Sequence, residues 1–242
     1  MRSTSSSERS LRLELKLVCQ ESAYARVRMA LRLHPAALST LHPTRVVQSV
    51  YFDTTFGRAL EENLAGASRR EKLRFRWYGE DATSVAGSLE RKLRENTLGW
   101  KQVAPVASRV RVAGSERRAF VRAIEHGLPP EEDELRFLLR QGLEPAQWIR
   151  YRRDYLSTAD GRVRVTLDRE LVAYDLRARR TLTRMGPTPT PRLLILEAKC
   201  AAEDYAEARD ITSRLSIPVD RCSKFVIAAD PAHGPYASIF PE

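Results

Sequence analysis

The chain has 242 residues, of which 43% are hydrophobic and 30% charged, enough apolar material for one large domain or two small ones. This hydrophobic content excludes a disordered or collagen-like chain. A membrane-spanning chain is excluded because no stretch of about 18 uncharged apolar residues occurs. The 41 lysines and arginines exceed the 31 acids by 10, so we expect an anionic partner. Nucleic acid, anionic lipid and polyphosphate all meet that expectation.

Several common kinds of site have no support in the sequence. The three cysteines, Cys19, Cys200 and Cys222, are odd in number and lack the CxxC spacing of zinc sites, so we expect neither a disulfide nor structural zinc. No GxxxxGK[ST] phosphate-binding loop is present. The polar N-terminus has no apolar stretch typical of a signal peptide, and we therefore expect a cytoplasmic chain.

The first ten residues are rich in serine and arginine. We expect residues 1–10 to form a disordered tail, followed by a single domain over residues 11–242. From Leu11 to Leu17 every second residue is leucine, with Arg12, Glu14 and Lys16 between them. That period of two predicts a strand with one buried face and one polar face.

The remaining elements follow from the same two periodicities. Strands are predicted at 45–52, 72–78, 88–93, 148–156, 162–168 and 193–199, and helices at 21–33, 115–126, 131–141 and 202–215. Residues 177–192 have no period and predict a loop, and an apolar segment at 224–229 closes the chain. Runs of strands mixed with amphipathic helices predict an α+β protein.

The strand at 72–78 carries the clearest pattern. Lys72, Arg74 and Arg76 share one face with Tyr78, whereas Phe75 and Trp77 lie on the opposite face. Sheets that bind single-stranded nucleic acid place aromatic rings among their cations so that bases can stack. Because most of the rings here lie on the other face, no nucleic-acid partner is expected.

A carboxylate two residues before a lysine recurs in three predicted strands: Glu14/Lys16, Glu90/Lys92 and Glu197/Lys199. Residues i and i+2 lie about 6.6–6.8 Å apart on one face, so each pair offers an acid for a metal beside a cation for an anion. One interpretation is a sheet with these charges in water. The other is an antiparallel β-barrel of about eight strands with a basic interior, surrounded by helices.

Eight stretches, taken in order over residues 11–229, resemble the VTC domain, the polyphosphate polymerase branch of the triphosphate tunnel metalloenzyme (CYTH-like) superfamily. They are Arg12-Leu-Glu-Leu-Lys16, Ser49-Val-Tyr-Phe-Asp53, Lys72-Leu-Arg-Phe-Arg-Trp-Tyr-Gly79, Leu89-Glu-Arg-Lys92, Tyr151-Arg-Arg153, Val163-Arg-Val-Thr-Leu-Asp168, Leu196-Glu-Ala-Lys199 and Ser223-Lys-Phe225.

The resemblance implies one catalytic domain, a tunnel barrel in which the γ-phosphate of ATP passes to a growing polyphosphate chain. It implies that triphosphate and polyphosphate are bound by Lys16, Lys72, Arg74, Arg76, Lys92, Lys101, Arg153, Arg164, Lys199, Ser223 and Lys224. Arg74, Arg76, Lys92 and Glu197 would be the catalytic residues. Glu197 would hold Mn²⁺ or Mg²⁺, with Glu14 as a second candidate ligand.

The chain departs from the hydrolytic members of the superfamily, which usually begin with ExExK, because Arg12 stands in the first acidic place. One metal-binding acid is therefore missing, and this favours transfer to a phosphate over activation of a water. A triphosphatase acting on tripolyphosphate or a nucleoside triphosphate remains an alternative, as does a non-catalytic polyanion-binding domain. The N-terminal domain and membrane segments of eukaryotic members are not expected, so a membrane-protein partner and the oligomeric state stay open.

Overall fold

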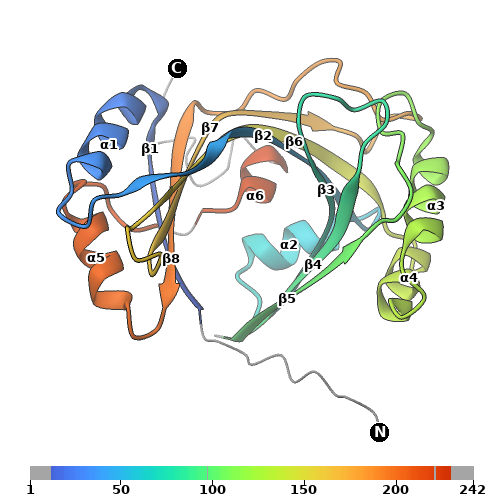
Figure 1. The fold of residues 1–242 in the computed structure, drawn as a ribbon. Helices are drawn as coiled ribbons and strands as arrows, with labels where there is room; N and C mark the ends of the chain where they lie inside the picture. The colour runs from blue at the N-terminus through green and yellow to red at the C-terminus, as the bar shows by residue number, and fades with distance from the viewer. Residues whose placement is uncertain (1–11, 97, 221, 230–242) are drawn as a thin grey trace, which may run out of the picture. The chain divides into compact units, whose positions relative to one another are not determined.

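A computed structural model describes residues 12–96, 98–220 and 222–229 (Figure 1). The predicted tail, residues 1–10, and the predicted strand start at Leu11 lie outside these ranges. Within the described ranges, none of the helices has the length and apolar character needed to cross a bilayer.

Eight strands form one sheet, in the order β1-β8-β7-β6-β2-β3-β4-β5, and the five strand pairs whose register is defined are antiparallel. Their bounds are β1 (Arg12–Gln20), β2 (Ser39–Asp53), β3 (Arg69–Tyr78), β4 (Gly87–Glu95), β5 (Leu98–Pro105), β6 (Glu144–Ser157), β7 (Arg164–Asp175) and β8 (Leu193–Ala201). Together with the helices, this sheet confirms the predicted fold class, α+β with an antiparallel sheet of about eight strands.

The described helices are η1 (Glu21–Ala23), α1 (Tyr24–Arg32), α2 (Arg58–Leu64), α3 (Arg117–Gly127), α4 (Asp133–Arg140), α5 (Tyr205–Ser213) and α6 (Lys224–Ala229). All four predicted helices are present. The sequence did not predict α2, whose first turn is held by the buried carboxylate of Asp53. That side chain accepts hydrogen bonds from the backbone N–H groups of Thr54, Ala59 and Leu60 at 2.8, 2.8 and 3.2 Å.

The chain clusters into two compact units. The first comprises Met1–Thr44, Arg153–Arg169 and Leu193–Cys222, and the second comprises Arg45–Arg152, Glu170–Arg192 and Ser223–Glu242. The sequence predicted a single domain over 11–242, and that assignment stays a prediction.

The core of the first unit lies between the sheet and two helices. Leu17 of β1 and Leu196 of β8 pack in one cluster with Val27 and Leu31 of α1 and with Ile211 of α5. Figure 1 shows α1 and α5 on the same side of β1 and β8. Because strand residues alternate between the two faces, the polar side chains of β1 and β8 lie on the side away from these helices.

The core of the second unit is built in the same way. Phe75 and Trp77 of β3 and Leu89 of β4 pack with Phe120 of α3 and Leu135 of α4. Figure 1 shows α3 and α4 on one side of β3, β4 and β5, with α2 on the other. The face of the strands that α3 and α4 leave uncovered is the one that carries Lys72, Arg74 and Arg76.

Candidate functional site

Three lysines lie side by side across three strands of the second unit. Lys72 on β3 is directly opposite Lys92 on β4, which is opposite Lys101 on β5. Like charges at directly opposed positions destabilise a sheet, so other interactions of the fold must compensate for the repulsion among these three lysines. A row of this kind is suited to binding a ligand with several negative charges.

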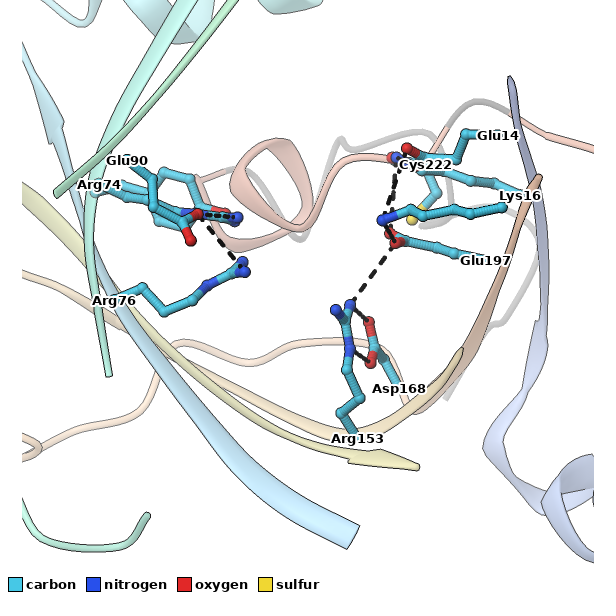
Figure 2. A network of polar contacts seen from close by, with 11 residues as sticks. Glu14, Lys16, Arg74, Arg76, Glu90, Arg153, Asp168, Glu197 and Cys222 are labelled. Carbon is cyan, nitrogen blue, oxygen red and sulfur yellow. Dashed lines mark hydrogen bonds and ion pairs between the residues drawn. The ribbon is translucent and has the colours of Figure 1, made fainter. Parts of the chain in front are cut away.

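The next row on the same face contains a carboxylate between cations. Tyr51 of β2, Arg74 and Glu90 are neighbours in register. Arg74 donates from Nε and Nη2 to Oε2 of Glu90 at 2.8 and 2.7 Å, and from Nη1 to the Tyr51 hydroxyl at 2.7 Å. Lys101 Nζ lies 3.0 Å from Oε1 of Glu90. Arg76 Nη1 lies 3.6 Å from Oε2 of the same carboxylate (Figure 2). Glu90 thus collects three cations around one carboxylate.

The titration behaviour of this group follows from that geometry. Burial alone would raise the pKa of the Glu90 carboxyl, but the three cations hold it at about 2. Burial, reinforced by the two arginines and opposed by Glu90, lowers the pKa of Lys101. Burial also acts to raise the pKa of the Tyr51 phenol, but Arg74 and Arg76 outweigh it and the net shift is downward. The positive potential of the cluster therefore dominates over desolvation.

Arg76 differs from Arg74 in how its donors are used. Arg76 is 9% exposed, and its buried Nε has no hydrogen-bond partner in the described part of the chain. Its contact with Glu90, at 3.6 Å, is an ion pair beyond hydrogen-bond distance. Buried donors are almost always paired in native structures, so an unpaired guanidinium N–H needs an explanation.

The start of α6 adds two further predicted residues to this unit. Lys72 Nζ donates a hydrogen bond to the hydroxyl of Ser223 at 2.8 Å. Lys224 Nζ lies 4.9 Å from the centre of the Tyr151 ring, a cation–π distance. Seven predicted site residues therefore belong to this unit: Lys72, Arg74, Arg76, Lys92, Lys101, Ser223 and Lys224.

The first unit contains a chequerboard of charges on β1 and β8. In register, Glu14 faces Lys199 and Lys16 faces Glu197. Lys16 Nζ lies 3.0 Å from Glu14 and 3.8 Å from Glu197 (Figure 2). Lys199 Nζ lies 3.9 and 3.2 Å from the same carboxylates. The Glu-x-Lys pair of β1 is thus matched in reverse by the Glu-x-Lys pair of β8.

Arg153 extends this group along the first unit. It donates from Nε and Nη2 to the two carboxylate oxygens of Asp168, at 2.5 and 2.6 Å, and Nη2 lies 3.7 Å from Glu197. Lys16 Nζ also donates to the backbone carbonyl of Cys222 at 3.2 Å. Arg164 is exposed and faces Lys199 in register. The predicted residues of the first unit are therefore neighbours, with Arg153 held in a bidentate pair.

The carboxylates of Glu14 and Glu197 are the two predicted metal ligands. Mg²⁺ is commonly held by one or two carboxylates, with water and substrate phosphates completing its six ligands. Nowhere in the described ranges do three or more His, Cys, Asp or Glu side chains form a ligating group. The pair fits a cation that takes its remaining ligands from water and phosphate, and it does not fit a cage made by protein alone.

Sequence reasoning assigned no site role to Tyr51 or Asp168, and it marked Glu90 only as the acid of one of the three Glu-x-Lys pairs. Its contact with Arg74 depends on the register between β3 and β4, which period-two alternation does not define. The bidentate pairing of Asp168 with Arg153 likewise requires the placement of β6 against β7.

Comparison with known proteins gives one family. The model of the VTC domain matches residues 11–233. No curated protein sequence matches the chain. Among solved structures, a chain described as "Structure of the Schizosaccharomyces pombe Mediator head module" is similar with 13% sequence identity and a TM-score of 0.41, covering 85% of this chain and 92% of that chain.

Proposed function

Because this chain belongs to the VTC domain family, we propose that it is a polyphosphate polymerase that transfers the γ-phosphate of ATP to a growing polyphosphate chain with the aid of Mn²⁺ or Mg²⁺. ATP and inorganic polyphosphate are then its substrates and product. The proposal deepens the family assignment by naming a reaction.

The observation that carries the proposal is the buried Nε of Arg76, which has no hydrogen-bond partner in the described part of the chain. A buried cation with an unsatisfied N–H is costly to the empty protein, and an anionic oxygen relieves that cost. Arg74 and Lys101 contact the same carboxylate as Arg76, so a ligand at Arg76 meets several cations. A phosphate offers several acceptor oxygens and more than one negative charge, which suits this group.

The reaction places few covalent demands on the protein. An oxygen of the terminal phosphate of the acceptor chain forms a bond to the γ-phosphorus of ATP. The bond from that phosphorus to the bridging oxygen breaks, and ADP leaves with the electron pair. In-line placement and neutralisation of the spreading negative charge provide the catalysis, and no protein nucleophile is required. In the second unit Arg74, Arg76, Lys92 and Lys101 supply that positive charge.

The acids named in the proposal belong to the first unit. Glu197, with Glu14 beside it, would hold the divalent cation, which when bound neutralises phosphate charge. Lys16 and Lys199 lie within 4 Å of both carboxylates, and their positive charges reduce the repulsion between Glu14 and Glu197. Arg153, fixed by Asp168, restrains Glu197 from the side.

The test is to incubate the purified full-length chain with ATP and Mn²⁺ and to resolve the phosphate products on a gel, beside Glu197→Gln. Glu125→Ala is the control, since Glu125 pairs with Arg140 on the helices outside both clusters. We expect polymer and ADP from the wild type and the control, and loss of polymer in Glu197→Gln. Orthophosphate without polymer would replace the proposal with a triphosphatase. Triphosphate binding without turnover would replace it with a polyanion-binding domain.

A further inference from the structure

A third row of polar side chains lies beyond Arg74 on the same face of the second unit. Ser49 of β2 is directly opposite Arg76 of β3, which is opposite Ser88 of β4. A serine is therefore the register neighbour of Arg76 on each side. Arg76 is the most buried of the cations at this end of the face, because 10% of its side chain is exposed, against 23% for Arg74 and 46% for Lys101.

Ser49 has no structural use for its hydroxyl. The residue is 1% exposed, and its Oγ has no hydrogen-bond partner among the residues that the structure describes. Arg76 Nε in the same row is likewise unpaired. Each of these two neighbouring polar groups costs free energy that an apolar side chain would avoid, so the pair calls for an explanation.

We propose that Ser49 is a phosphate-binding residue, which forms with Arg76 the deepest phosphate subsite of the second unit. The inference rests on the proposed function, because it takes triphosphate or polyphosphate as the ligand. The serine hydroxyl donates one hydrogen bond and the guanidinium donates from Nε to the oxygens of one phosphate group. One ligand group thereby satisfies both orphaned atoms.

The Ser49→Ala variant should lose affinity for tripolyphosphate without losing thermal stability. Removing a hydroxyl that has no partner leaves an apolar methyl in a buried site, so the melting temperature of the ligand-free protein stays the same or rises. Affinity for inorganic tripolyphosphate, measured by calorimetry on the full-length chain, falls about tenfold because a hydrogen bond to a charged oxygen is lost. A hydroxyl with a structural role would give the reverse pattern.

Ser157→Ala is the matched control. Ser157 is also buried, at 5% exposure, but its hydroxyl donates to the backbone carbonyl of Val163 at 3.5 Å in the first unit. We expect this variant to bind tripolyphosphate as the wild type does and to melt at a slightly lower temperature. It shows whether loss of any buried serine hydroxyl changes the affinity.

The possible results separate the two claims. Wild-type affinity in Ser49→Ala overturns the subsite even if the chain makes polymer. Reduced affinity in Ser49→Ala supports the subsite even if ATP yields no polymer, in which case only the polymerase fails. A wild-type chain that does not bind tripolyphosphate overturns both.

Discussion

Arg74 and Arg76 lie two residues apart on one strand, but they differ in how much each contributes to the stability of the fold. Arg74 holds Glu90 through two hydrogen bonds, so Arg74→Ala leaves a buried carboxylate without its main partner. We expect this variant to lose about 3 kcal/mol of unfolding free energy. Arg76→Ala removes a group whose Nε is unpaired, and we expect a loss of about 1 kcal/mol or less.

Both substitutions should weaken tripolyphosphate binding at least tenfold, since each removes a cation of the proposed site. Urea unfolding measures the stability and calorimetry the affinity. Equal losses of stability in the two variants would show that Arg76 is also a structural ion-pair residue.

Glu90 gives a prediction about pH. Its pKa in the folded protein is about 2, below the ordinary value of 4.5, so the charged carboxylate favours the folded state. That contribution, about 3 kcal/mol, is complete above pH 4.5 and is lost as the pH falls toward 2. We expect the stability difference between the wild type and Glu90→Gln to shrink over that range in urea unfolding. A difference that does not change with pH would mean that the carboxylate carries no such shift.

Among single residues, the sequence predicted the site residues that can be recognised from their residue type and from alternation along a strand. Lys72, Arg74 and Arg76 share one face of β3, as expected. Neither the pairing of Glu90 with these arginines nor the isolation of Arg76 Nε could be predicted. Both depend on which residue of the neighbouring strand lies opposite, and a shift of register would change every such contact.

At the scale of elements, the strand pair β3 and β4 depends on one glycine. A Cβ at Gly87 would lie 2.5 Å from the Phe75 ring and 2.6 Å from the carbonyl oxygen of Arg76. Gly87→Ala therefore forces β4 away from β3, and we expect it to cost about 2 kcal/mol of unfolding free energy.

Gly99, in β5 of the neighbouring hairpin, is the control. A Cβ there meets only the carbonyl oxygen of Leu93 at 3.7 Å, an ordinary contact. Gly99→Ala should be neutral or slightly stabilising, because alanine has fewer unfolded conformations to lose. Chemical unfolding of both variants tests the comparison, and a neutral Gly87→Ala would show that the strands can separate at little cost.

Elements with a clear period were predicted and those fixed by distant contacts were not. The helices at 115–126 and 131–141 correspond to α3 and α4 within a few residues. Helix α2 was not predicted because its capping residue, Asp53, lies at the end of strand β2 and not directly before the helix. Strand β2 begins at Ser39, six residues before the predicted start at 45. The sequence did not predict this part because its residues are exposed and lack the alternation of buried and exposed positions.

For the whole molecule, the net charge of +10 predicts how salt affects binding. Raising NaCl from about 0.1 M to about 1 M shortens the screening length from about 10 Å to about 3 Å. We expect the rise in melting temperature caused by tripolyphosphate to shrink over this range, and to be small at every salt concentration in Arg76→Ala. A salt-independent rise would argue against charge as the basis of binding.

The pairing of β1 with β8 has a consequence for synthesis on the ribosome. Gln20 of β1 lies opposite Leu193 of β8, so the first strand in the described part of the chain pairs with the last one described. At 5–20 residues per second, β1 waits roughly 10 to 40 s before its partner is translated. During that time the leucines that later fill the core of the first unit are exposed on the nascent chain. A chaperone that binds nascent apolar strands should therefore raise the yield of folded protein more than it raises the amount synthesised.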